Sequence, residues 1–309
     1  MVASALVAIH FVATVTLGSM SQWTMDRSNS RRAWVLGGGG LRGAAEVGMA
    51  RALAAAGLQP DLVVGTSVGS INGAVLASAP IDESVARLTE MWESMAVKSV
   101  FQESLISRVR NLVNHWTHLH SNEPLRRLID QWVPYAKVED AHVHFECVAA
   151  CIETSSEHWF TSGSVRDAIL ASCALPGVLP PVKVGGRHYI DGGVVNSIPV
   201  SRAIELGADE IYVLHVGHID DELEVPRHPW DVAMVSFEIA RRHRFHTEMN
   251  RQRDGVTIHV MPTGRAAGRY NDLSKLRYNN VRPIRAAVKA AEAAGTEYLE
   301  HRASGQRLD

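Results

Sequence analysis

The stretch Gly65-Thr66-Ser67-Val68-Gly69 follows the apolar run Leu62-Val63-Val64 directly and precedes a helical run that begins near Ser70. A serine between glycines on a tight strand-to-helix turn has an exposed hydroxyl, with the positive end of the helix behind it. Such a turn is typical of a serine that attacks carbonyl carbon. The same residues also fit a plain turn, in which the glycines supply unusual backbone angles and Ser67 only caps the helix. The surrounding sequence decides between these interpretations.

A second glycine-rich stretch lies upstream of the serine. Here Gly37-Gly38-Gly39-Gly40-Leu41-Arg42-Gly43 follows the apolar run 33–36 and opens a predicted helix over 44–56. Consecutive glycines let the backbone approach a ligand closely, and their amides can converge on a negative oxygen. The stretch therefore predicts an anion-binding loop.

A dinucleotide-binding oxidoreductase is the alternative interpretation of this loop. Gly38, Gly40 and Gly43 match the glycine fingerprint of dinucleotide-binding folds, which places an acidic residue at the end of the second strand to meet a ribose. In this chain Asp61 begins the second strand, and the end of that strand carries Ser67. The context favours a serine site, and the oxidoreductase stays as a second hypothesis.

A third stretch, Asp191-Gly192-Gly193, follows the strand-like run 187–190. If that strand belongs to a parallel sheet, its carboxyl end lies at the same edge as Ser67, where such folds place their sites. The aspartate is then able to reach the serine. A glycine turn in which Asp191 bonds its own backbone is the simpler alternative.

Four ordered blocks resemble the patatin-like phospholipases, most closely the bacterial branch related to the catalytic domain of neuropathy target esterase. They are the glycine loop, the Ser67 turn, the stretch Ala171-Ser172-Cys173-Ala174-Leu175-Pro176-Gly177 and the Asp191 turn. The resemblance implies a lipid acyl hydrolase with Ser67 as nucleophile and Asp191 as base, with no catalytic histidine and no cofactor. It implies phospholipid, lysophospholipid or other acyl ester substrates, and a role in lipid catabolism or membrane lipid remodelling. A catalytically silent interaction protein with this fold remains a third hypothesis.

The resemblance also implies an oxyanion hole in the glycine loop, formed at Gly38, Gly39, Gly40, Arg42 and Gly43. One residue departs from the family pattern. Glu46 stands where close relatives often carry histidine or another neutral polar residue, one helical turn past the loop. We expect its side chain on an exposed helix face.

A serine-histidine triad has to be weighed, because the chain contains 15 histidines. His215 ends a strand-like run and follows the serine and the aspartate, in the order of the common α/β hydrolases. His188 precedes Asp191 on one strand at an odd spacing, so alternation sends the two side chains to opposite faces. His215 is therefore the alternative base.

The order of expected elements predicts an α/β protein with a three-layer patatin-like fold: a mostly parallel central sheet flanked by helices. We assign 31–309 to this hydrolase domain and 81–133 to a helical insertion. We expect the insertion's tryptophans to pack in the core, with the lining of an acyl-chain pocket as the alternative. Further strands are predicted over 142–151, 188–190, 211–216 and 256–260, and further helices over 165–173, 200–206, 231–253 and 273–302.

Residues 1–30 form an apolar N-terminal extension. Val2 to Leu17 is almost wholly apolar, yet no lysine or arginine precedes Arg27. The run lacks the cationic start of a secretory signal and falls short of the length of a spanning helix. We expect the natural product to start at Met20 or Met25, with a weak anchor or a packed segment as alternatives.

Composition narrows the choice of partners and compartment. A net charge of −2 gives no basic field for nucleic acid. The three cysteines have no metal-site spacing, and Cys147 and Cys151 lie about 13 Å apart on a strand, too far for a disulfide. We predict a cytoplasmic protein that needs no metal, with peripheral contact at the inner membrane face as an open possibility. The cluster Arg241-Arg242-His243-Arg244 is expected to be a solvated helix face, with contact to anionic head groups as the alternative.

Overall fold

The computed structural model describes residues 30–97, 120–216, 222–227, 229–250, 254–264 and 281–304. Residues 1–29 of the predicted N-terminal extension and residues 98–119 of the predicted insertion lie outside these ranges. Within the described ranges, none of the helices combines the length and the apolar character that crossing a membrane requires.

The strands form one eight-stranded sheet with the order β5-β6-β3-β2-β1-β7-β8, and β4 pairs with β3 outside this path. Pairing is parallel from β3 through β2, β1 and β7 to β8, and it is antiparallel where β3 meets β4 and β6 and where β5 meets β6. The strands are β1 (Arg32–Leu36), β2 (Leu62–Thr66), β3 (His144–Cys151), β4 (Ser156–Phe160), β5 (Val182–Val184), β6 (Arg187–Asp191), β7 (Glu210–Leu214) and β8 (Thr257–Val260).

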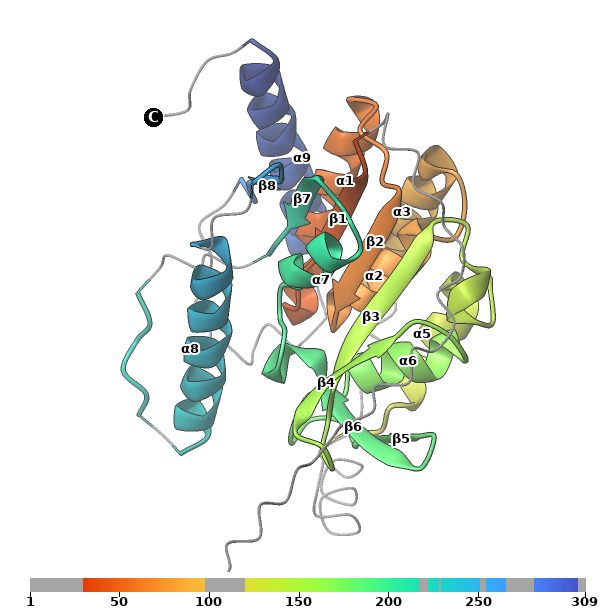
Figure 1. The fold of residues 1–309 in the computed structure, drawn as a ribbon, viewed down its shortest axis with the longest axis vertical. Coiled ribbons are helices and arrows are strands. Elements are labelled where there is room, and N and C mark those ends of the chain that lie inside the picture. Colours follow the sequence, from red (N-terminus) through yellow and green to blue (C-terminus); the bar gives the residue numbers. More distant parts are fainter. Residues whose placement is uncertain are drawn as a thin grey trace, which may run out of the picture. The chain divides into compact units, whose positions relative to one another are not determined.

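Helices cover both faces of the sheet, as β1 illustrates (Figure 1). Because strand side chains alternate, Trp34 and Leu36 join the core beneath α1, α2, α3, α5, α6 and α9, while Ala33 and Val35 join a second core beneath α7 and α8. The three layers and the mostly parallel sheet confirm the predicted fold class. The helices are α1 (Ala44–Ala55), α2 (Val68–Leu76), α3 (Ile81–Val97), α5 (Glu123–Trp132), α6 (Val165–Ser172), α7 (Val200–Glu205), α8 (Pro229–Met249) and α9 (Val281–Ala303).

The described part of the insertion consists of α3 and α5. Trp92 of α3 is only 1% exposed, and its indole N–H donates to Asn72 Oδ1 of α2 at 2.9 Å. This tryptophan therefore packs in the core, as expected. The antiparallel strands β4 and β5 were not predicted from the sequence.

The relation of β6 to β2 differs from the expectation of parallel strands ending at one sheet edge. β3 pairs with β4 along 147–151, with β2 along 144–148 and with β6 along 149–151. A strand has only two edges, so the overlaps with β4 place β2 and β6 on the same edge of β3. β2 runs parallel to β3 and β6 runs antiparallel to it, and the two strands meet end to end. Their last residues, Thr66 and Asp191, pair with the consecutive residues Val148 and Ala149.

Candidate active site

The serine turn has the strained geometry that its sequence predicts. Ser67 has φ 55° and ψ −125°, which is unusual for a residue other than glycine. Its side chain makes no capping hydrogen bond to α2, so the plain-turn interpretation fails. A Cβ atom on Gly65 would lie 2.4 Å from Gly69 O, and one on Gly69 would lie 2.4 Å from Leu36 O. Both glycines are therefore required because the backbones approach so closely.

The serine hydroxyl faces a carboxylate 124 positions further along the chain. Ser67 Oγ donates a hydrogen bond to Asp191 Oδ2 at 2.7 Å. The contact follows from the sheet, because β2 and β6 end at adjacent positions on one edge of β3. No intermediate residue separates the hydroxyl from the carboxylate.

The Asp191 carboxyl is buried, with 1% of the residue exposed. Its Oδ1 atom accepts a hydrogen bond from the Gly193 amide at 2.7 Å. Burial raises the pKa of Asp191 to about 6, against the opposing effect of the hydrogen bonds from Ser67 and Gly193. A carboxylate with this pKa is a stronger base than a solvated aspartate and is still ionised at neutral pH. A Cβ atom on Gly192 would lie 2.2 Å from Val148 O, so this turn packs directly on β3.

The C-terminal end of α6 holds the backbone of the serine turn. Ser172 Oγ accepts a hydrogen bond from the Ser67 amide at 2.9 Å, and Cys173 Sγ donates to the Ser67 carbonyl oxygen at 3.1 Å. The hydroxyl of Ser70 also donates to that oxygen, at 2.6 Å. Ser172 and Cys173 belong to the third block of the resemblance, but no sequence pattern indicates what they contact.

The glycine loop contributes to the site unevenly. A Cβ atom on Gly38 would lie 3.5 Å from Ser67 Cβ, so this residue borders the serine. The Gly38 amide nevertheless donates to Ser197 O at 2.9 Å. Gly39 and Gly40 are exposed, and Gly40 has φ 57°. The Gly38 amide is thus already bonded within the protein.

The other two predicted loop residues play local structural roles. The Arg42 amide donates to Gly39 O at 3.3 Å and closes the 3-10 turn Gly40–Gly43. A Cβ atom on Gly43 would lie 2.5 Å from Val68 Cγ2, so Gly43 gives the valine of the serine turn room to pack.

The expectation that Glu46 lies on an exposed helix face is wrong. Its relative exposure is 0%, because α1 buries this face against α2. The side-chain amide of Asn72 donates to Glu46 Oε2 at 2.7 Å and to Gly43 O at 3.0 Å. Burial raises the pKa of Glu46 well above its usual value, although the hydrogen bond from Asn72 opposes the shift. Periodicity alone did not reveal this, because α1 is buried over most of its surface.

The histidines considered for a triad lie in other environments. His215 is 3% exposed and its ring stacks on Phe245 of α8, with a centroid distance of 6.1 Å. His188 pairs with Glu153 at 2.7 Å. The hydrogen bond from Ser67 goes directly to Asp191, which favours the dyad. Within the described residues, His, Cys, Asp and Glu side chains form no group of three suited to a metal ion, and all three cysteines are free and buried.

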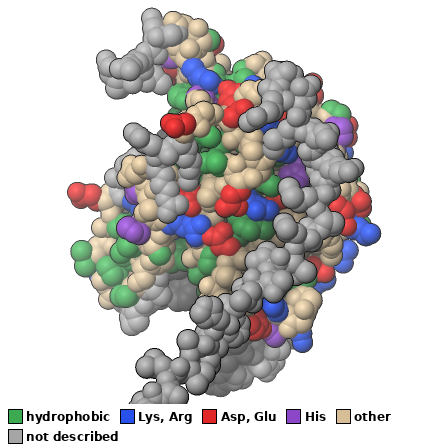
Figure 2. All heavy atoms as spheres, in the orientation of Figure 1, with side chains coloured by type: hydrophobic (Ala, Val, Ile, Leu, Met, Phe, Trp, Pro, Cys, Tyr) green, Lys and Arg blue, Asp and Glu red, His purple; other side chains and the backbone are tan. Residues whose placement is uncertain are grey.

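The basic cluster on α8 is only partly solvated, which corrects the expectation of a solvated face. Arg241 is 9% exposed, and both Arg241 and Arg242 pair with Glu238 of the same helix, at 2.6 and 2.9 Å. Arg244 pairs with Glu157 of β4 at 2.5 Å. On the face shown in Figure 2, acidic and basic side chains are interspersed. The three arginines are therefore paired with carboxylates of the same chain, although the Arg244 side chain is 38% exposed.

Comparison with known proteins shows the family to which the region of this site belongs. The family model for patatin-like phospholipases matches residues 34–204, a region that contains the glycine loop, the Ser67 turn and Asp191. The chain is 33% identical over 188 residues to a lysophospholipase nte1 of Aspergillus terreus and 34% identical over 188 residues to a lysophospholipase NTE1 of Coccidioides immitis. These alignments cover 60% of this chain and 12% of each relative, so the chain spans only a small part of their length. The crystal structure of VipD from Legionella pneumophila aligns with 88% of this chain and 67% of its own, at 14% identity and a TM-score of 0.40.

The fold and the site define a three-layer α/β protein in which a strained serine turn faces a buried carboxylate. The chain belongs to the patatin-like phospholipase family, because the family model matches more than half of it. This confirms the resemblance that the four sequence blocks indicate. It also favours an ester hydrolase over a dinucleotide-binding oxidoreductase.

Proposed function

We propose that this protein is a serine lipid acyl hydrolase that cleaves carboxylic esters through an acyl-enzyme on Ser67, with Asp191 as the base. The 2.7 Å hydrogen bond from Ser67 Oγ to Asp191 Oδ2 is the observation that carries the proposal. A serine hydroxyl becomes an effective nucleophile only when a neighbouring base takes its proton. The raised pKa of Asp191 suits it to this role near neutral pH.

The cycle needs only these two side chains and water. As Ser67 Oγ bonds to the ester carbonyl carbon, its proton passes to Asp191, which then protonates the departing alcohol. Water next gives a proton to Asp191 and attacks the acyl carbon. The fatty acid leaves, and Ser67 Oγ recovers its proton from Asp191.

The negative oxygen of the intermediate requires hydrogen-bond donors in place before the reaction. We assign this role to the amides of Gly39 and Gly40, because both residues are exposed beside Gly38, which borders Ser67. The Gly38 amide can contribute only after it leaves Ser197 O.

Lysophospholipids are the substrate class that the names of the relatives support. We extend this class to phospholipids and other acyl esters, because the same acyl-enzyme forms from each of them. A role in lipid catabolism or membrane lipid remodelling follows from that chemistry.

Labelling with a fluorophosphonate tests the proposal, because the probe reacts only with an activated serine. We expect labelling at Ser67 and hydrolysis of a short-chain nitrophenyl ester, both lost in Ser67→Ala and Asp191→Asn while the circular dichroism spectrum is unchanged. His215→Ala is the matched control and should stay active. Loss of activity in His215→Ala with activity retained in Asp191→Asn would replace the dyad by a histidine triad. A folded wild-type protein that the probe does not label would be the silent interaction protein.

We further propose peripheral contact with a membrane, because a lipid substrate resides at an interface. The paired arginines of α8 argue against head-group recognition by that cluster. Flotation with neutral and with anionic liposomes tests the contact, and equal recovery of the protein with both would exclude an electrostatic contribution. Absence from both floated fractions would exclude the contact itself.

A further inference from the structure

Helix α8 lies beyond residues 34–204, the region that the family model matches, yet it contacts the turn that carries Asp191. A Cβ atom on Gly193 would lie 3.0 Å from Phe237 Cζ, so this ring packs against the glycine whose amide binds the Asp191 carboxylate. The close packing ties the position of the turn to α8.

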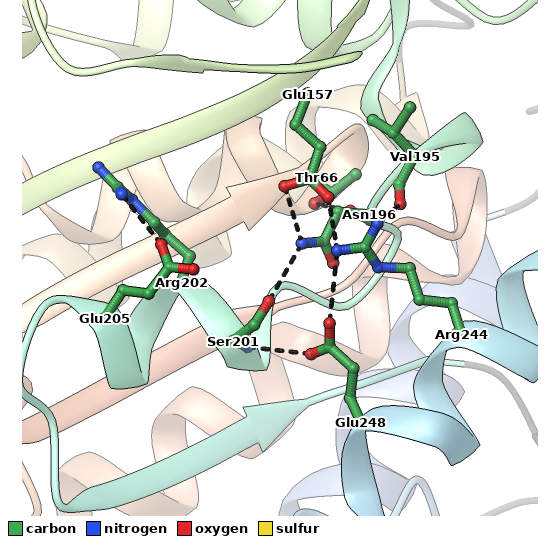
Figure 3. A network of polar contacts seen from close by, with 9 residues as sticks. All are labelled: Thr66, Glu157, Val195, Asn196, Ser201, Arg202, Glu205, Arg244 and Glu248. Carbon is green, nitrogen blue, oxygen red and sulfur yellow. Dashed lines mark hydrogen bonds and ion pairs between the residues drawn. The ribbon is translucent and has the colours of Figure 1, made fainter. Parts of the chain in front are cut away.

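A second contact from α8 is polar. The guanidinium of Arg244 donates to Val195 O at 2.5 Å and pairs with Glu157 of β4, also at 2.5 Å (Figure 3). Glu248, one turn further along α8, accepts from Arg244 at 3.4 Å and from the Ser201 amide at 3.1 Å. A single side chain thus joins α8, the segment after Asp191 and β4.

The same network reaches the residue before the nucleophile. Asn196 follows Val195, and its side-chain amide donates to Glu157 at 3.4 Å. Its carbonyl oxygen accepts from Thr66 Oγ1 at 2.8 Å, and Thr66 is fully buried (Figure 3). Segment 195–196 is therefore fixed on one side to the serine turn and on the other to Arg244.

We propose that Arg244 is a positioning residue for the Ser67–Asp191 pair. The inference rests on the proposed function and assigns Arg244 no contact with the reacting atoms. Asp191 lies in a short turn, and segment 195–196 follows that turn. Removing Arg244 would let this segment move, and the turn that holds Asp191 would move with it. A displacement of about 1 Å in such an arrangement lowers a rate by about 100-fold.

The burial of its carboxylates distinguishes this network from an ordinary surface ion pair. Exposed pairs contribute little, whereas charge-assisted hydrogen bonds to partly buried groups are stronger. The side chain of Arg244 is 38% exposed, whereas those of its partners Glu157 and Glu248 are 25% and 7% exposed. Removing Arg244 would leave both carboxylates without their cation and Val195 O without this donor.

The test compares Arg244→Ala with Arg242→Ala, which removes a neighbouring arginine that pairs with Glu238 on its own helix. For Arg244→Ala we expect kcat for the nitrophenyl ester to fall by about 10- to 100-fold with KM nearly unchanged, because geometry rather than binding is altered. The rate of fluorophosphonate labelling should fall in parallel. The kcat of Arg244→Lys should lie between that of the wild type and that of Arg244→Ala. Added guanidinium should partly restore the kcat of Arg244→Ala. Arg242→Ala should keep the wild-type kcat.

Each outcome decides between the two proposals. If the probe does not label wild-type Ser67, the proposed function fails. If the wild type is labelled and Arg244→Ala matches Arg242→Ala in kcat, only the positioning role fails. If Arg244→Ala does not fold, Glu157→Gln takes its place, with an expected loss in kcat at an unchanged melting temperature. An unchanged kcat in Glu157→Gln then overturns the inference.

Discussion

A carboxylate that takes a proton directly from serine needs a pKa closer to neutrality than that of a solvated aspartate. In this protein burial supplies the shift, and the hydrogen bonds from Ser67 and Gly193 limit it. The hydrogen bond to Gly193 also fixes the orientation of the carboxyl. The turn in which Asp191 lies thus sets both the basicity and the orientation of its carboxylate.

The raised pKa of Asp191 predicts how the rate depends on pH. The base is the ionised form, so kcat/KM should rise with pH and level off above about 6, with a decrease of about tenfold per pH unit below that value. The measurement is the nitrophenyl ester rate from pH 4.5 to 8, limited to pH values at which circular dichroism shows a folded protein. A rate that is flat through pH 6 would argue against Asp191 as the base.

The buried Glu46 predicts a dependence of stability on pH. Burial raises its pKa, so the folded protein holds a proton that the unfolded chain has already released above about 4.5. The contribution of Glu46 to the free energy of unfolding is therefore fully present at low pH. It is lost as the pH rises through the pKa of Glu46 in the folded protein. Glu46→Gln keeps the shape and the acceptor for Asn72 but carries no charge.

We therefore expect Glu46→Gln to flatten the fall in the free energy of unfolding between pH 5 and pH 8. Urea titration at both pH values measures this free energy. Glu292→Gln, which removes an exposed carboxylate from the surface of α9, is the control. A larger destabilisation of Glu46→Gln at pH 8 than at pH 5 would contradict this account.

At the scale of elements, the site depends on two strands that share one edge of β3. β2 and β6 approach each other from opposite directions and end at adjacent positions. Ser67 and Asp191 therefore meet without a long loop to connect them. The closeness of Gly192 to Val148 O sets how near β6 can come.

Gly192→Ala should disturb this junction, because the new Cβ would lie 2.2 Å from the β3 backbone. Overpacking of this kind typically destabilises by about 1–3 kcal/mol. We expect a loss of that order in urea titration and a fluorophosphonate labelling rate lowered by at least about tenfold through displacement of Asp191.

Gly73→Ala on α2 is the matched control for that variant. Its Cβ would meet side-chain atoms of Val63 and Phe145 at 3.1 Å, and these can adjust. Alanine also has a higher helix propensity than glycine. Equal labelling rates in the two variants would refute the role given to the β2–β6 junction.

At the scale of the whole molecule, all described strands and helices lie within the unit Arg31–Asp309. We propose this unit as the hydrolase domain. A protein that starts at Ser30 should fold and be labelled at Ser67 at the wild-type rate, because β1 and its partners β2 and β7 are retained. The rate of fluorophosphonate labelling is measured for the full chain and for the shortened protein. If the shortened protein does not unfold cooperatively, the proposed domain boundary is wrong.

The sequence by itself determined the class of fold and the serine turn, and it singled out Ser67 and Asp191, whose side chains the structure joins by a hydrogen bond. These rest on local rules: glycine spacing, apolar runs and residues at strand ends, all visible along the chain. The sequence did not determine that β6 runs against β3, that Glu46 is buried or that Arg244 binds the segment after Asp191. Only the tertiary structure decided these three features, because each depends on which surfaces meet in three dimensions. They are the direction of a strand, the burial of a polar residue on a helix, and a hydrogen bond between residues 49 positions apart.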